Sequence, residues 1–160
     1  MNNSETAIQA FKYVQLAYHQ GLITFQPCKI SSDLFVHFDT PNNSPRFTYV
    51  IFDPNDSEKI IAQCVIVFSH KISKDDCKWH IGWCVDENHR NKGYGFKVAS
   101  EGLEEFLVNN RNINGDIIEA HVDEGNIASL KISEKLIGSE EEVFNPETGL
   151  KIHSFLKVIE

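Results

Sequence analysis

The stretch Trp79-His80-Ile81-Gly82-Trp83-Cys84-Val85, followed after four residues by Arg90-Asn91-Lys92-Gly93-Tyr94-Gly95, decides the fold. An apolar run, a tight glycine turn and an amphipathic stretch from Phe96 to Val108 predict a strand, a turn and a helix in succession. The backbone amides of such a turn point outward, and the dipole of the following helix adds positive potential. The turn is therefore suited to hold a phosphate group.

The charge of the chain limits the class of ligand. The formal net charge is -8 and the isoelectric point is about 5.3, which disfavours nucleic acid as a partner. Against this background, three cations lie at or near the turn: Arg90, Lys92 and Lys97. This pattern favours one specific anionic cofactor over general affinity for polyanions, and it mildly favours a cationic substrate.

Length and composition predict one soluble domain over residues 1–160, because 41% of the residues are apolar and 24% are charged. The longest apolar stretch, Ile60 to Phe68, is interrupted by Gln63 and is too short to span a bilayer, so no membrane contact is predicted. No export signal is visible from Met1 to Glu5, and the four cysteines form no CxxC pair. We therefore expect a cytoplasmic protein with reduced thiols. The seven histidines lack H-x-x-x-H spacing, so no metal site is predicted.

Periodicity and turn residues outline the other elements. Helices are predicted at Ala7–Tyr18, Phe96–Val108 and Asn126–Ile137. Strands are predicted at Leu34–Phe38, Arg46–Phe52, Ile60–Phe68, Trp79–Val85, Asp116–Val122, Glu142–Phe144 and Ile152–Val158, while Leu22–Lys29 is either a short strand or a linker. A polar loop is predicted at Lys71–Cys77, and Asn109–Gly115 closes the second helix.

The glycine turn alone leaves several interpretations open. A dinucleotide-binding turn needs a third glycine, and Val98 occupies that position. A nucleotide P-loop needs Gly-Lys-Ser/Thr, which is absent. On this turn alone, a glycine-rich bend that binds nothing and a nucleotide-binding α/β protein both remain alternatives.

A second motif follows at Ile118-Glu119-Ala120-His121-Val122, then Asn126-Ile127-Ala128-Ser129 and Glu134-Lys135-Leu136. Together with the glycine turn it resembles the signature of the GNAT superfamily of N-acetyltransferases, and most of all the ribosomal-protein-acetyltransferase-like branch. The resemblance covers about residues 79–138. It implies an α/β fold with a mixed, mostly antiparallel sheet of six to seven strands, flanked by about three to four helices. The strands at Trp79–Val85 and Asp116–Val122 would form its central parallel pair.

The resemblance also implies the chemistry. The acetyl group of acetyl-CoA would pass to a primary amine, either a small cationic amine or a peptide or protein N-terminus, by direct attack in a ternary complex. In this family the first signature strand splays from its neighbour and exposes backbone groups to the pantetheine arm. The expected cofactor-binding residues are Cys84, Val85, Arg90, Asn91, Lys92, Gly93, Tyr94, Gly95, Asn126 and Ser129.

The sequence indicates the groups that transfer protons less clearly than it indicates the cofactor-binding residues. Strand alternation places Glu119 and His121 on one face, and Glu119 is the first choice for the general base, followed by His80 and His121. Many members protonate the leaving thiolate with a Tyr at the position that Ser133 occupies here. The resemblance implies Ser129 as the preferred acid, because part of this branch uses a Ser at that position, and Ser133 and Tyr94 are weaker candidates.

Two further departures from the family bear on function. The third predicted helix ends in Leu136-Ile137-Gly138-Ser139 rather than Leu-Gly-Phe, and only one helix precedes the first hairpin. These differences bear on the acceptor more than on the cofactor. They also keep an alternative open, a non-catalytic acyl-CoA-binding or regulatory module on the same fold. A homodimer is a further prediction about partners.

Overall fold

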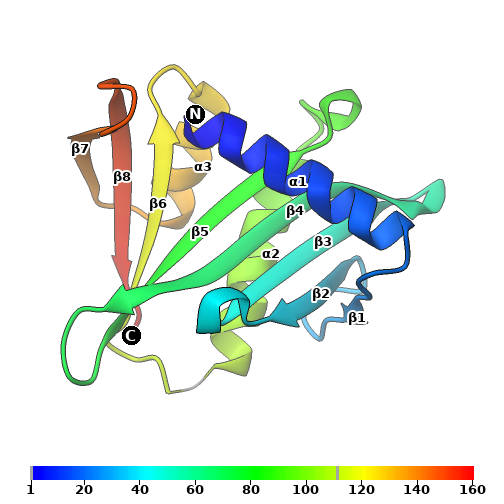
Figure 1. Ribbon diagram of the computed structural model, residues 1–160, viewed down its shortest axis with the longest axis horizontal. Coiled ribbons are helices and arrows are strands. Elements are labelled where there is room, and N and C mark those ends of the chain that lie inside the picture. Colours follow the sequence, from blue (N-terminus) through cyan, green and yellow to red (C-terminus); the bar gives the residue numbers. More distant parts are fainter. Residues whose placement is uncertain (1, 111) are drawn as a thin grey trace.

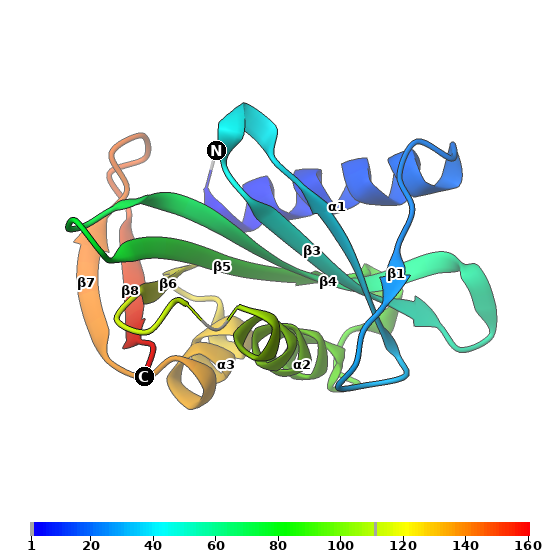
Figure 2. The same ribbon diagram turned by 90° about the horizontal axis from the view of Figure 1, so that it is seen from below.

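An eight-stranded sheet with helices on both faces organises the chain (Figure 1). The computed structural model describes residues 2–110 and 112–160. Within them the strand order is β1-β2-β3-β4-β5-β6-β8-β7, and all neighbours are antiparallel except β5 and β6, which are parallel. Helix α1 covers one face of the sheet, and α2 and α3 cover the other (Figure 2).

The helices are α1 (Asn3–His19), α2 (Tyr94–Asn109) and α3 (Ile127–Leu136). The strands are β1 (Gln26–Pro27), β2 (Leu34–Asp39), β3 (Arg46–Asp53), β4 (Asp56–Lys71), β5 (Cys77–Val85), β6 (Ile117–Asp123), β7 (Glu140–Phe144) and β8 (Lys151–Val158). The predicted mixed sheet with its central parallel pair is confirmed, as is the predicted number of helices for the described residues. The strand count exceeds the prediction by one, because the segment Leu22–Lys29 contains the short edge strand β1.

Helix α1 begins four residues earlier than its apolar pattern predicts. The side chain of Asn2 accepts a hydrogen bond from the N–H of Glu5 at 2.8 Å, and Glu5 returns one to the N–H of Asn2. This capping box stabilises a first turn made of polar residues, which carries no hydrophobic periodicity. Phe11 and Ala17 are buried on the face that packs against the sheet.

Strand ends also extend beyond the predicted boundaries. β4 continues past Phe68 to Lys71, where it pairs with Cys77 of β5, so the predicted loop at Lys71–Cys77 is shorter than expected. Polar residues at strand ends continue the hydrogen-bonded ladder without the apolar signal that marks its centre. Arg111, in the predicted segment Asn109–Gly115, lies outside the described residues, as does Met1.

The main core lies between the sheet and helix α2. Val98, Leu103 and Phe106 of α2 are almost completely buried there. Gly102 allows close approach, because a Cβ at this position would lie 3.2 Å from the Tyr49 ring and 3.3 Å from Cys64. This packing fixes the direction of α2 and hence the position of the glycine turn at its start. No helix among the described residues is long and apolar enough to cross a bilayer.

Candidate functional site

The central feature is a gap between β5 and β6. The two strands pair over only three residues each, ending at His80 and Glu119, although β5 continues to Val85 and β6 to Asp123. Figure 1 shows the strands starting side by side and then diverging toward the start of α1. Each strand remains fully paired on its other side, so the sheet is opened here without being broken.

The closed end of the gap is held by Asp116, a buried carboxylate just before β6. It accepts hydrogen bonds from the N–H of Cys77 and from the indole N–H of Trp79, both at 2.9 Å. At the open end the N–H of Asp86 donates to Ile61 O of β4. Because successive residues of a strand point their backbone groups to opposite sides, this contact turns the amide of Val85 toward the gap.

The glycine turn lies at the open end of the gap. Asn91 and Gly93 adopt positive φ values of 61° and 83°, and α2 begins at Tyr94. Within the described part of the chain, no N–H from Asn91 to Phe96 donates a hydrogen bond to another protein group. Such a run of free amides before a helix forms an anion-binding nest.

Gly93 and Gly95 are required at the turn for different structural reasons. Gly93 needs its left-handed backbone, and a Cβ there would meet nothing within 4 Å. A Cβ on Gly95 would lie 3.2 Å from Ile132 Cδ1 and 3.6 Å from Val85 Cγ2. Gly95 therefore also serves the close contact of α2 with α3 and β5.

A cavity of about 560 Å³, here called the turn cavity, lies over the glycine turn and the open end of the gap. It brings together all but one of the predicted cofactor-binding residues: Cys84, Val85, Arg90, Asn91, Gly93, Tyr94, Gly95, Asn126 and Ser129. The exception is Lys92, which lines a separate hollow on the other side of the turn.

The predicted cations divide into two groups. Lys97 is already paired, since its ammonium lies 2.9 Å from Glu101 and 3.2 Å from Asp33. Among the described side chains, Arg90 and Lys92 form no ion pair, and both are exposed. These two side chains are left to supply positive charge at the turn.

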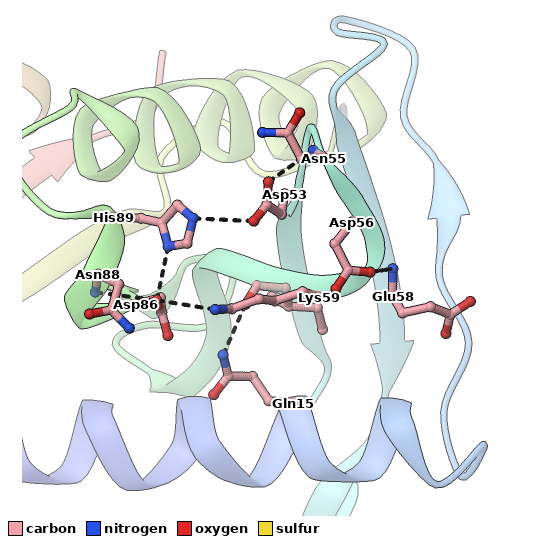
Figure 3. Close-up of polar contacts among 10 residues, drawn as sticks. Gln15, Asp53, Asn55, Asp56, Glu58, Lys59, Asp86, Asn88 and His89 are labelled. Atoms are coloured by element: carbon pink, nitrogen blue, oxygen red, sulfur yellow. Dashed lines mark hydrogen bonds and ion pairs between the residues drawn. The ribbon is translucent and has the colours of Figure 1, made fainter.

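A polar network braces the segment that leads into the turn (Figure 3). His89 lies between two carboxylates, with Nδ1 2.9 Å from Asp86 and Nε2 3.3 Å from Asp53. The N–H of Asn55, with His89, holds the pKa of Asp53 below its usual value. His89 also lines the turn cavity and contacts the ring of Tyr94. It therefore ties the β3–β4 hairpin to the cavity wall.

A second cavity of about 220 Å³, here called the α1 cavity, lies between α1 and strands β4, β5 and β6. Five residues line both cavities, so the two are adjacent: Ser4, Ala7, Trp83, Asn126 and Ser129. The start of α1 is fixed to the end of β6, because the Asp123 carboxylate accepts from the N–H of Ser4 at 2.8 Å and from Asn3 Nδ2 at 2.9 Å.

Two histidines line the α1 cavity with their rings 5.2 Å apart, His80 and His121. Burial, with the nearby His121, lowers the pKa of His80 to about 4, so that this ring is neutral at pH 7. Glu119 is absent from the residues that line either cavity. Its carboxylate lies 3.1 Å from His121 Nε2 and 2.9 Å from Lys78.

Glu119 is held firmly as an anion. Burial works to raise the pKa of Glu119, but the hydrogen bond and charge of Lys78, with His121 and Ser154, outweigh it and keep the pKa below the usual value. This carboxylate is thus a weaker base than an ordinary Glu, which favours a role in orienting His121.

Ser129 lies where the two cavities meet. The indole N–H of Trp83 donates to Ser129 Oγ at 3.2 Å, which leaves the hydroxyl hydrogen of Ser129 free to donate elsewhere. Ser133, the position of the family Tyr, is completely buried and lines neither cavity. Of the predicted acids, Ser129 and Tyr94 therefore reach the turn cavity and Ser133 does not.

Several lining residues were not predicted from the sequence. His89, Trp83, Gln63 and the α1 residues Ser4 and Ala7 all contribute to the cavities. Of these, Gln63 had a visible signal, because it is the only polar residue in the apolar run Ile60–Phe68. The others depend on long-range packing that no local pattern reports.

Comparison with known proteins identifies a family whose model matches most of this chain. The family model described as "Acetyltransferase (GNAT) domain" matches residues 15–137. No curated protein matches the sequence significantly.

Solved structures show the same fold at low identity. A GNAT-family acetyltransferase from Streptococcus pneumoniae is 16% identical, with a TM-score of 0.51 over 72% of this chain and 67% of that one. A ribosomal-protein-S5-alanine acetyltransferase from Vibrio fischeri is 18% identical, with a TM-score of 0.53 over 72% and 62%. Arabidopsis thaliana NAA60 in complex with acetyl-CoA is 13% identical, with a TM-score of 0.52 over 72% and 76%.

Proposed function

The chain belongs to the GNAT family of acetyl-CoA-dependent acetyltransferases, and on this premise we propose that it transfers the acetyl group to a primary amine. The observation that carries the proposal is the pair of adjacent cavities that meet at Trp83, Asn126 and Ser129. One cavity for the cofactor and one for the acceptor allow direct transfer in a ternary complex, without a covalent enzyme intermediate.

The residues present fit acetyl-CoA. The free amides of Asn91–Phe96, with unpaired Arg90, suit a diphosphate, and the gap-facing amide of Val85 suits the amide-containing pantetheine arm. Asn126, which caps α3 through Ser129 N–H, lines the junction of the cavities. When bound, acetyl-CoA supplies an acetyl group activated as a thioester.

We assign proton acceptance to His121, oriented by Glu119. A lysine-like amine with a pKa of about 10.4 is mostly protonated at neutral pH and must lose a proton before it can attack. A carboxylate beside Nε2 of His121 favours the proton on that nitrogen and leaves Nδ1 free to accept one. The neutral ring of His80 packs edge-on against His121 and supports its position.

Ser129 is the proposed acid. With Trp83 donating to its oxygen, the hydroxyl can give its hydrogen to the leaving thiolate. A thiol pKa of about 8.5, by analogy with cysteine, makes the thiolate a fair leaving group, so this contribution is modest.

The remaining expectations rest on this assignment. A single catalytic domain over residues 1–160 is part of the proposal, because one sheet carries both cavities. A small amine and a peptide N-terminus are both acceptors of the proposed chemistry. The cytoplasmic location and the homodimer stay predictions.

The test is an assay of CoA thiol release with a panel of primary amines and peptides. We expect turnover with at least one acceptor, and His121→Asn should lower kcat by about 100-fold or more while acetyl-CoA binding is unchanged. His19→Asn, an exposed histidine at the far end of α1, is the matched control. Acetyl-CoA binding without turnover on any acceptor would instead favour the non-catalytic module.

A further inference from the structure

We propose that the α1 cavity selects a primary monoamine with a compact apolar body about the size of one benzene ring, rather than a polyamine. The inference rests on the proposed function and names the acceptor class of that same site. It is carried by the size of the cavity, its apolar walls, its lack of a free carboxylate, and two residues outside the proposed catalytic group, Gly82 and Gln63.

The volume and walls of the α1 cavity suit such a body. An apolar cavity of about 150 Å³ is enough to hold benzene, and the α1 cavity measures about 220 Å³. Its walls include apolar side chains from α1 and from β4: Ala7, Ala10, Val65 and Val67. A ring with a short aminoalkyl arm fills this space, and burial of its apolar surface favours binding.

Gly82 leaves part of this space open. It lies on β5 opposite Val65, and a Cβ added to it would meet no atom within 4 Å. Its backbone is not in the left-handed region, so no turn or strain requires glycine there. The missing side chain enlarges the cavity instead of relieving a contact within the protein.

The charges around the cavity disfavour a second ammonium group. Asp123 lines the cavity, but its carboxylate is occupied by the start of α1 through Asn3 and Ser4. Glu119 lies outside the lining and is neutralised by Lys78. Among the described residues that line the cavity, Asp123 carries the only carboxylate, and a distal ammonium would have to compete with the start of α1 for it; a buried charge without such a partner is costly.

Gln63 supplies a polar group that is free to bind the acceptor. The residue is 2% exposed and lines the α1 cavity from β4. Its buried carboxamide oxygen has no hydrogen-bond partner among the described residues. This oxygen can therefore accept a hydrogen bond from the amine N–H of a bound acceptor.

The transfer balances for such an amine. The ammonium loses one proton to His121, which passes it to water, and the free amine then forms a bond to the carbonyl carbon. The carbon–sulfur bond breaks as the departing sulfur takes the proton of Ser129, and Ser129 regains a proton that the nitrogen gives up through water. The net products are one amide, one thiol and one released proton.

The test compares 2-phenylethylamine, methylamine and spermidine as acceptors for the wild-type protein and for Gly82→Ala and Gly82→Leu. Wild-type kcat/KM should be at least about tenfold higher for 2-phenylethylamine than for spermidine. Gly82→Leu should lower kcat/KM for 2-phenylethylamine by about tenfold or more and Gly82→Ala by less, and in each variant the loss for methylamine should be the smaller of the two. Calorimetry should show loss of 2-phenylethylamine binding to CoA-loaded Gly82→Leu and an unchanged acetyl-CoA affinity.

A second variant makes the test independent of Gly82. Gln63→Leu should raise KM for both monoamines by about tenfold and leave acetyl-CoA affinity unchanged. Preference for spermidine, or unchanged 2-phenylethylamine binding in Gly82→Leu, would overturn the acceptor class while leaving the acetyltransferase assignment intact. Hexanoyl-CoA is assayed as an alternative acyl donor. If Gly82→Leu lowered turnover only with this donor, the cavity would hold an acyl chain instead of the amine, and the inference would fail. Absence of turnover with every amine would contradict the proposed function itself.

Discussion

Replacement of Asp123 should weaken the attachment of helix α1, which lines both cavities, to the end of β6. The Asp123 carboxylate accepts hydrogen bonds from Ser4 N–H at 2.8 Å, Asn3 Nδ2 at 2.9 Å and Asn3 N–H at 3.3 Å. It is also an anion at the positive end of α1. Asp123→Ala removes all three bonds, whereas Asp123→Asn keeps an acceptor and removes the charge.

The magnitude follows from these contacts. Hydrogen bonds to a charged group contribute about 1.5–3 kcal/mol each when buried, but Asp123 is only half-buried and water can reach the freed amides. We therefore expect Asp123→Ala to lower the free energy of unfolding by about 2 kcal/mol in total, and Asp123→Asn by about 1 kcal/mol.

The effect should depend on pH. Burial works to raise the pKa of Asp123, but the hydrogen bonds from Ser4 and Asn3 outweigh it and hold the pKa below that of an unfolded aspartate, about 3.9. A lowered folded pKa means that the stabilisation is complete above about pH 5 and is lost as the pH falls below about 4.

Urea unfolding at pH 7 and at pH 3 measures this directly. The difference between wild type and Asp123→Ala should be present at pH 7 and should shrink at pH 3. Because Ser4 and Ala7 line both cavities, KM should rise for the amine and for acetyl-CoA. Equal stability of the two proteins at pH 7, or an undiminished difference at pH 3, would show that the Asp123 carboxylate does not hold the start of α1.

Three further substitutions test other parts of the site. Gly95→Ala should cost about 1 kcal/mol in urea unfolding, because its Cβ would lie 3.2 Å from Ile132; full wild-type stability would argue against close packing there. His89→Ala should raise the Kd for acetyl-CoA about three- to tenfold in calorimetry by freeing the segment before the turn, and an unchanged Kd would show that this brace does not matter for binding. Glu119→Gln should lower kcat about 10- to 100-fold at constant acetyl-CoA affinity, and unaltered kcat would remove Glu119 from catalysis.

The sequence predicts a structural feature most reliably where one local pattern determines it. The glycine turn has a positive φ at Gly93 that only special residues adopt easily, and α2 follows it with a strong apolar face. The Asn126 side chain caps α3 at the predicted start of this helix, through a bond from Ser129 N–H. Such features depend on neighbours in the chain, so that a single sequence displays them.

The sequence predicts side-chain interactions less reliably where the hydrogen-bond or ion-pair partner is distant in the chain. Lys97 fits the cation pattern, but Asp33 from a remote loop pairs with it. Glu119 has the right strand face for a base, yet Lys78 and Ser154 on the neighbouring strands hold its carboxylate. Side-chain pairing across a sheet depends on strand register, which periodicity alone does not give.

The first turn of α1 was missed for a similar reason. It is polar and is held by its own capping box and by Asp123, so neither hydrophobic spacing nor local charge marks it as structured. This helix nevertheless forms one wall of the α1 cavity, so the proposed acceptor site cannot be described without it.

Calorimetric titration of acetyl-CoA into Gly93→Asp and Gly93→Asn measures whether the free amides of the glycine turn hold the diphosphate. Both variants place a side chain of similar size on the same left-handed backbone, which Asn and Asp tolerate comparably, and only Asp adds a negative charge beside the free amides. We expect Gly93→Asp to bind acetyl-CoA at least about tenfold more weakly than Gly93→Asn. Equal affinity of the two variants would show that the diphosphate is held elsewhere.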